Sequence, residues 1–274
     1  MATALRIALF VEGATTPPSV RGPSPFVQIW NEHLCGALGI RAFDEIVPIS
    51  KKHLVAMDRK QPKMSGASEP LDELIARKLK TIRFDAVVVA WDLVPAWNPE
   101  DEFCRWEETC DLYRYLAASP SVDLPKIWKQ RAKERLAELK SRSMPSNRAR
   151  PPELKPGTVV ALCMEPMFET ILVSDEQAAR HAFGLTQAPK DWPTAAWKLP
   201  NERKPDARIL IPTINAVRNL RPKPRCVTQV PGDFRSNKDG WSEYLLKRLL
   251  ANPKAKSQIL STKLLKRLNE IAPK

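Results

Sequence analysis

Acidic residues follow three apolar segments that have the length of buried strands. The pairs are residues 5–11 with Glu12, residues 84–90, which end at Trp91-Asp92, with Asp92, and residues 158–164 with Glu165. In an open parallel sheet, ligands bind beyond the carboxyl ends of the strands, so we expect these acids to meet at one edge. Clustered carboxylates repel each other, and a hard divalent cation such as Mg²⁺ or Mn²⁺ allows them to stay ionised. The pattern predicts a metal site formed by Glu12, Asp92 and Glu165, with Glu169 one turn further along the chain.

Simpler interpretations of these acids stay open. Glu12 precedes Gly13 and could be an ordinary turn residue at a strand end. The acids at 100–102 and 175–176 are typical of the first turn of a helix, where they face the positive end of the helix dipole. Asp92 is the stronger candidate because it follows a continuous valine strand, and a carboxylate near such an apolar core needs a partner.

The elements that would position these acids alternate between strands and helices, which predicts an α/β fold: a mainly parallel sheet flanked by helices. The run Val87-Val88-Val89 is typical of a strand covered on both faces. A strand at 46–49 contains Pro48, which places it at a sheet edge. Caps and apolar periodicity predict helices that begin near Ser24, Ser68 and Asn98, and further helices at 124–140, 168–183 (one or two), 241–250 and 259–271.

Charge is unevenly distributed along the 274 residues. Residues 1–120 contain 14 Lys/Arg and 16 Asp/Glu, whereas residues 121–274 contain 30 and 15, a net charge of +15. A segregated basic half is typical of a protein that binds phosphates, although an acidic protein partner would also fit. The basic side chains predicted to lie largely outward on helix 124–140 are Lys126, Lys129, Arg131, Lys133 and Arg135.

A second basic stretch covers residues 198–225, with Trp192 and Trp197 nearby. These tryptophans could stack on bases, but packing in the core is the more usual role of large aromatic side chains. Sequence periodicity says little about the fold of residues 186–225.

Composition limits the domain organisation and the compartment. We expect an α/β domain over residues 1–184, with 124–157 as an insertion, and a basic C-terminal region over 185–274. The five scattered cysteines indicate a reducing compartment, and their spacing does not suit zinc. There is no apolar run of membrane-spanning length, so the expected location is cytoplasmic, away from membranes.

Three segments together resemble TOPRIM domains, which occur in topoisomerases, primases and overcoming-lysogenisation-defect-type nucleases. Val11-Glu12-Gly13-Ala14-Thr15-Thr16 resembles their "VEGxTE" opening, and Val88-Val89-Ala90-Trp91-Asp92 resembles their second acidic motif. Phe168-Glu169-Thr170-Ile171-Leu172-Val173-Ser174-Asp175 is similar to the "EAWLLAD" segment of a stand-alone bacterial TOPRIM-like family. Members of that family often lie beside ATPase genes in defence-type loci. The resemblance therefore implies antiviral defence, with an ATPase or another subunit of a defence complex as a partner.

The resemblance also implies roles for individual residues. Glu12 corresponds to the catalytic or metal-proximal glutamate, Asp92 to the first metal-binding aspartate, and Glu169 and Asp175 to a later acidic pair. Arg235 stands near a basic element of that family and would contact phosphate. Thr16 replaces an expected glutamate, and Val94 replaces the second aspartate of the Asp-x-Asp motif.

Because of these departures, the site could be either catalytically active or degenerate. The first hypothesis is a Mg²⁺- or Mn²⁺-dependent nuclease in which Glu12 and Asp92 act on DNA or RNA. The second is a catalytically degenerate TOPRIM-like subunit that binds nucleic acid. The third is a scaffold whose basic half contacts an acidic partner.

Overall fold

The protein forms two compact units that interleave along the chain. The structure is a computed structural model that describes residues 5–13, 24–59, 69–95, 105–142, 149–199 and 202–271. The first unit contains residues 1–13, 43–164 and 267–274, and the second contains 14–42 and 165–266. This division differs from the expected boundary between residues 184 and 185, because helices from distant parts of the chain pack together in the second unit.

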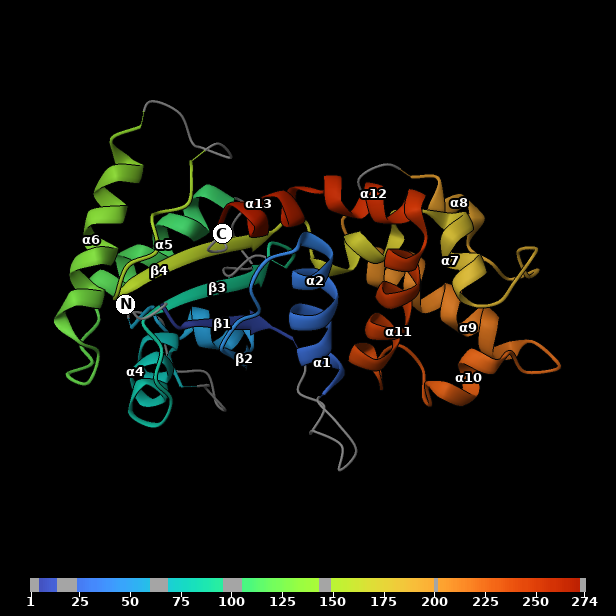
Figure 1. The fold of residues 1–274 in the computed structure, drawn as a ribbon, viewed down its shortest axis with the longest axis horizontal. Helices are drawn as coiled ribbons and strands as arrows, with labels where there is room; N and C mark the ends of the chain where they lie inside the picture. The colour runs from blue at the N-terminus through green and yellow to red at the C-terminus, as the bar shows by residue number, and fades with distance from the viewer. Residues whose placement is uncertain are drawn as a thin grey trace. The chain divides into compact units, whose positions relative to one another are not determined.

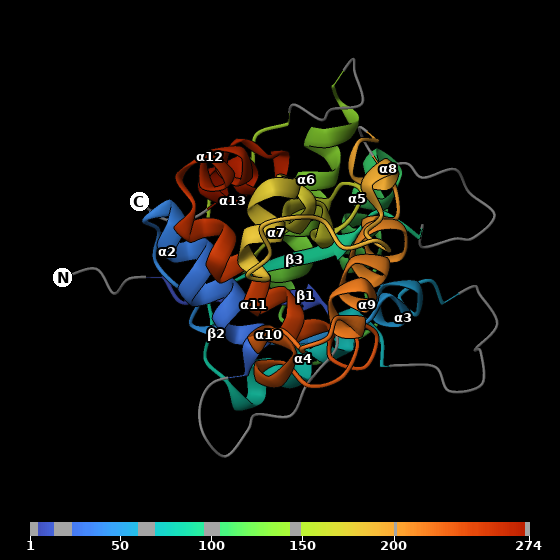
Figure 2. The ribbon, with the colours of Figure 1, turned by 90° about the vertical axis from the view of Figure 1, so that its right-hand side faces the viewer.

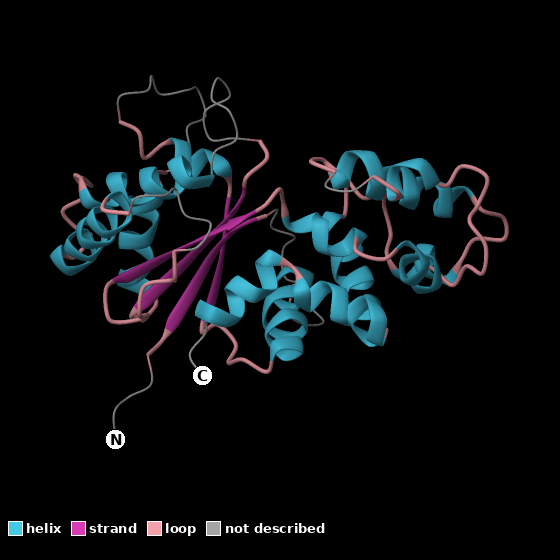
Figure 3. Ribbon diagram, turned by 90° about the horizontal axis from the view of Figure 1, so that it is seen from above, coloured by secondary structure: helices cyan, strands magenta, loops and turns pink. Residues whose placement is uncertain are grey.

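A four-stranded, fully parallel sheet forms the centre of the first unit, as the sequence predicts (Figure 3). The strand order is β2-β1-β3-β4. The strands are β1 (Ile7–Glu12), β2 (Glu45–Ile49), β3 (Ala86–Asp92) and β4 (Thr158–Met164). Every residue of β3 and β4 is buried, which accounts for their continuous apolar sequences. Pro48 lies in β2 at the edge of the sheet, where its missing N–H removes no hydrogen bond between central strands.

One face of the sheet packs on helices of the same unit (Figure 1). These are α3 (Lys51–Val55), α4 (Leu71–Thr81), α5 (Arg105–Ala117) and α6 (Lys126–Lys140). Alternate strand residues such as Phe10 and Val89 point into this core, as the twofold periodicity of a strand requires. Phe84 joins the layers, because its ring lies 6.0 Å from that of Phe10 and 6.0 Å from that of Trp128. Both contacts are edge to face, the arrangement that aromatic rings prefer. This core fixes α3 and α5 near the carboxyl ends of the strands.

The second unit is helical, with α11 near its middle in Figure 2. Its elements are α1 (Pro25–Val27), the π-helix η1 (Gln28–Leu34), α2 (Cys35–Leu38), the 3₁₀ helix η2 (Phe168–Val173), α7 (Glu176–Ala182), α8 (Thr194–Trp197), the π-helix η3 (Asp206–Leu210), α9 (Ile211–Asn219), α10 (Arg225–Gln229), α11 (Lys238–Ala251) and α12 (Pro253–Ser261). The last helix, α13 (Lys263–Ile271), begins in this unit and ends in the first. Phe183 holds α7 against α11, since its ring lies 6.2 Å from Trp241 and 6.5 Å from Tyr244.

Some predicted helix boundaries need correction. The single helix expected at 259–271 is wrong, because Thr262 is extended (φ −64°, ψ 154°) and separates α12 from α13. The described part of residues 186–225, for which periodicity predicted little, contains three short helices, and a fourth, α10, begins at Arg225. Ser24 does begin a helix, and its hydroxyl accepts a hydrogen bond from the Val27 N–H. The predicted caps Ser68 and Asn98 lie outside the described residues.

Within the described ranges, no helix has the length and apolar character needed to cross a membrane.

Candidate functional site

Glu12 and Asp92 lie side by side at the carboxyl ends of β1 and β3. The two strands are neighbours in parallel register, with Val11 opposite Ala90. The backbone N–H of Asp92 donates a hydrogen bond of 3.0 Å to Oε2 of Glu12. Two acids separated by 80 positions in the sequence therefore meet at one edge of the sheet, because parallel strands end on the same side.

Lys51 joins these acids from the neighbouring strand. It is the first residue of α3 and follows β2, which also ends at this edge of the sheet. Its ammonium Nζ lies 3.6 Å from Oε2 of Glu12 and donates hydrogen bonds to the main-chain oxygens of Asp92 and Pro95. Only 13% of the Lys51 side chain and 19% of the Glu12 side chain are exposed, so the contact is largely shielded from water. Sequence reasoning missed Lys51, although it stands only two residues after the end of β2, close to the kind of position that identified the acids.

The donor set around Lys51 is suited to a hard cation. One carboxylate oxygen and two main-chain carbonyl oxygens converge on a single positive charge. Oxygens of these types are the ligands that Mg²⁺ and related ions prefer in proteins. In this structure the positive charge is the ammonium of Lys51, which shows that the residues at this edge can hold a cation.

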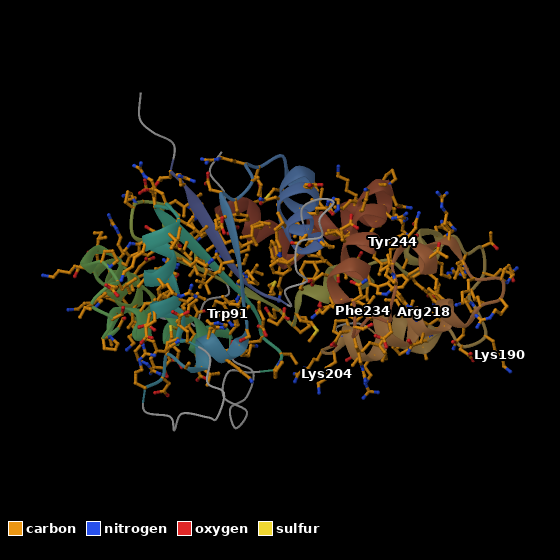
Figure 4. All side chains as sticks on the ribbon, turned by 90° about the horizontal axis from the view of Figure 1, so that it is seen from below. Trp91, Lys190, Lys204, Arg218, Phe234 and Tyr244 are labelled. Atoms are coloured by element: carbon orange, nitrogen blue, oxygen red, sulfur yellow. The ribbon has the colours of Figure 1, made fainter. Side chains whose placement is uncertain are left out.

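Buried polar side chains also surround Trp91, the residue before Asp92 in β3. Trp91 is fully buried, and its indole N–H donates a 2.6 Å hydrogen bond to the carboxylate of Glu108, which is only 6% exposed (Figure 4). Burial, and then the charge of Glu108, raise the pKa of the Cys163 thiol well above its usual value, against the opposing charges of Arg105 and Lys51. Because a thiol with a raised pKa stays protonated and is a poor nucleophile, Cys163 is a packing residue of β4.

The other two predicted metal ligands belong to the second unit, and each pairs with a lysine there. Glu165 lies 3.3 Å from Nζ of Lys263. Glu169 has no exposed surface and lies 2.6 Å from Nζ of Lys238 on α11. No group of three or more His, Cys, Asp or Glu side chains suited to a metal ion occurs among the residues that the structure describes.

Asp175, the last acid of the resemblance, begins α7. Its carboxylate accepts a hydrogen bond of 2.8 Å from the Ala178 N–H and lies 2.9 Å from the ammonium of Lys254. Burial opposes ionisation of this carboxyl, but these two contacts hold its pKa below the usual value. They are the contacts of a helix cap, which is the simpler interpretation that the sequence left open.

The predicted basic face of α6 is only partly available for phosphate contacts. Lys126 and Lys133 are exposed. Lys129, half-buried, donates a 2.7 Å hydrogen bond to the backbone oxygen of Ser121, and Arg131 lies 3.8 Å from Glu134.

Arg135 does not lie outward as predicted. It is 7% exposed, and it donates hydrogen bonds of 2.6 Å to Glu138 and to the backbone oxygen of Arg150. The periodicity of α6 did not reveal this, because the loop at 149–150 covers that side of the helix.

The basic stretch 198–225 has a different environment. It contains eight Lys/Arg and two Asp/Glu, and within the described part of the chain none of the eight forms an ion pair with a carboxylate. Seven of the eight are exposed: Lys198, Arg203, Lys204, Arg208, Arg221, Lys223 and Arg225. In Figure 4, Lys204 and Lys190 lie at the periphery of the second unit, whereas Arg218 lies further inside and donates to the backbone oxygen of Gly232. Arg235 is also exposed, next to the buried Phe234.

Trp192 and Trp197 stack on each other, with centroids 6.0 Å apart and an interplanar angle of 8°. Trp192 is buried, and its N–H donates to Glu176. The half-buried Trp197 donates to the hydroxyl of Thr213. Core packing therefore accounts for Trp192, in line with the simpler of the two interpretations.

Comparison of the chain with protein-family models, with curated proteins and with solved structures finds no match.

Proposed function

We propose that this protein is a nuclease-like enzyme that acts on nucleic-acid phosphodiesters with Mg²⁺ or Mn²⁺ at the carboxyl edge of β1 and β3. The observation that carries the proposal is that the Glu12 carboxylate and the main-chain oxygens of Asp92 and Pro95 face one positive charge, the ammonium of Lys51. The resemblance to TOPRIM domains assigns metal binding to these same two acids.

In this proposal the acidic edge of the sheet binds the metal, and the basic stretch 198–225 binds the nucleic acid. Glu12 and the Asp92 segment would hold the divalent cation, which polarises the phosphoryl group and activates water when bound. The exposed cations of residues 198–225 would hold the phosphate backbone, because positive side chains without carboxylate partners are neutralised by binding phosphates and releasing counterions.

Cleavage by purified protein tests the enzymatic proposal. Single- and double-stranded DNA and RNA are incubated with Mg²⁺ or Mn²⁺ and wild-type protein, Glu12→Gln, Asp92→Asn or the control Glu153→Gln. Glu153 is a suitable control because it is an exposed acid paired with Lys155. We expect cleavage by the wild type and the control, and none by the two site variants, which should still bind nucleic acid. Folded wild-type protein that binds nucleic acid but cuts none of these substrates would refute the enzymatic proposal.

A second candidate function is nucleic-acid binding without catalysis, which the cations of residues 198–225 favour independently of the acidic edge, since among the described residues they form no ion pair with a carboxylate. Its test compares Arg203→Gln/Lys204→Gln/Arg208→Gln with a control that removes the same charge from paired cations, Arg77→Gln/Lys80→Gln/Lys155→Gln. We expect only the first triple variant to weaken binding and to lower the salt dependence, by a slope of about 0.9 per lost phosphate contact on duplex DNA. Equal effects of the two triple variants would show that net charge, and not this stretch, determines binding.

A further inference from the structure

The ammonium of Lys51 fills the position in which a divalent cation would bind. Three oxygens face it: Oε2 of Glu12 and the main-chain oxygens of Asp92 and Pro95. The proposed function assigns these same oxygens to the divalent cation as ligands. A metal ion and the ammonium cannot both occupy this position, because two positive charges in contact repel each other strongly where water is largely excluded.

Lys51 can leave this position without unfolding the sheet. It begins α3, a helix of five residues, and its ammonium is carried by four flexible methylene groups. Leu54 of α3 is fully buried in the core of the first unit and anchors the helix there independently of Lys51. Two of the oxygens that would be left behind belong to Glu12 and Asp92, the last residues of β1 and β3, which are held by their strand pairing, and the third belongs to Pro95, three residues after β3.

We propose that Lys51 is a tethered counter-ion that competes with divalent metal for the site formed by Glu12, Asp92 and Pro95. Its ammonium neutralises Glu12 when no metal is bound, and its withdrawal admits the metal. Lys51 therefore lowers the metal affinity of the site and makes metal binding depend on a movement of the side chain. This inference rests on the proposed function for the identity of the site, but it concerns metal binding and not cleavage.

Manganese binding to the full chain tests the inference without any nuclease assay. Free Mn²⁺ is measured by electron paramagnetic resonance during titration of the wild type, Lys51→Met, Lys51→Gln, Lys51→Met/Glu12→Gln and the control Lys52→Met. Lys52 is a suitable control because it is the exposed neighbour of Lys51 in the same helix. Circular dichroism establishes that each variant is folded, and Lys51→Gln serves if the methionine variant does not fold.

We expect Lys51→Met and Lys51→Gln to bind one Mn²⁺ at least about tenfold more tightly than the wild type, because removal of the ammonium removes the repulsion of the incoming ion. Lys52→Met should match the wild type, and the double variant should lose the added affinity. Folded Lys51 variants with wild-type or weaker Mn²⁺ affinity would overturn the inference. Tighter Mn²⁺ binding in a protein that cuts no nucleic acid would refute the proposed nuclease while leaving the role of Lys51 intact.

Discussion

The hydroxyl of Tyr113 forms hydrogen bonds with the backbone of the edge strand β4. Tyr113→Phe therefore tests how much these hydrogen bonds contribute to the stability of the protein. β4 is the last strand in the order β2-β1-β3-β4, so within the described residues its outer backbone edge has no strand partner. The Tyr113 hydroxyl donates a 3.1 Å hydrogen bond to the backbone oxygen of Val159 and accepts one of 3.1 Å from the N–H of Ala161. Tyr113 is 1% exposed, so one oxygen atom satisfies two buried backbone groups.

Removal of this oxygen should be costly although the ring remains. A buried donor or acceptor left without a partner costs about 1–3 kcal/mol, and Tyr113→Phe leaves one of each. We therefore expect a loss of about 2–6 kcal/mol in the free energy of unfolding. The control is Tyr115→Phe, whose half-buried hydroxyl hydrogen-bonds the side chains of Arg114, at 3.3 Å, and Asp58, and not two buried backbone groups. That substitution should cost less than about 0.5 kcal/mol.

Urea unfolding followed by far-ultraviolet circular dichroism and by tryptophan fluorescence measures both variants. A loss for Tyr113→Phe no larger than that for Tyr115→Phe would contradict the argument that the hydroxyl serves the strand edge. The pH dependence offers a second measurement, because burial raises the pKa of Tyr113. A raised pKa means that the contribution to stability is complete below the unfolded value of about 10 and is lost as the pH rises above it. Tyr113→Phe should therefore remove part of the alkaline loss of stability that the wild type shows.

Two further predictions concern the pH dependence of the second unit and the left-handed glycines. The hydrogen bond of 2.9 Å from His33 lowers the pKa of Glu243. Its stabilising effect is therefore present above the unfolded pKa of about 4.3 and is lost as the pH falls through the folded value. Thermal unfolding of Glu243→Gln should show lower stability than wild type near neutral pH, with a difference that shrinks in acid; a difference that grows in acid would contradict the pairing. Gly157 and Gly184 both have a left-handed backbone, with φ of 84° and 76°. Alanine at either position should cost about 1–2 kcal/mol. The loss should be larger at Gly157, where Cβ would lie 3.0 Å from two carbons of Ile127. Equal losses in urea unfolding would show that Ile127 yields to the added carbon.

Lys51 shows why local patterns located the acids but not their partner. Glu12 and Asp92 stand out because an acid directly after a buried apolar run is unusual and its environment follows from the strand itself. Lys51 follows β2 in the same way, but lysines are so common on surfaces that the sequence offered no reason to separate it from Lys52. Only the parallel register of β1 between β2 and β3 places the ammonium against the Glu12 carboxylate and the main-chain oxygen of Asp92.

The pairs formed by Glu169 and Arg135 depended on tertiary structure for a related reason. Glu169 is buried against Lys238, and the two residues are 69 positions apart. Arg135 is covered by the loop that contains Arg150. Periodicity describes which face of an element is apolar, but it does not show which distant segment covers a charged side chain, so buried and exposed charges look alike in the sequence.

What the sequence by itself determined is the parallel sheet, the edge position of β2 and the placing of two acids at strand ends. These follow from local steric and hydrophobic rules: valine runs form buried strands, proline removes a hydrogen-bond donor, and parallel strands end on one side. The tertiary structure alone decided which charge faces Glu12, which cations lack carboxylate partners, and how residues 14–42 join residues 165–266 in one unit. These features depend on contacts between residues far apart in the chain, whose energies arise only when the elements pack together.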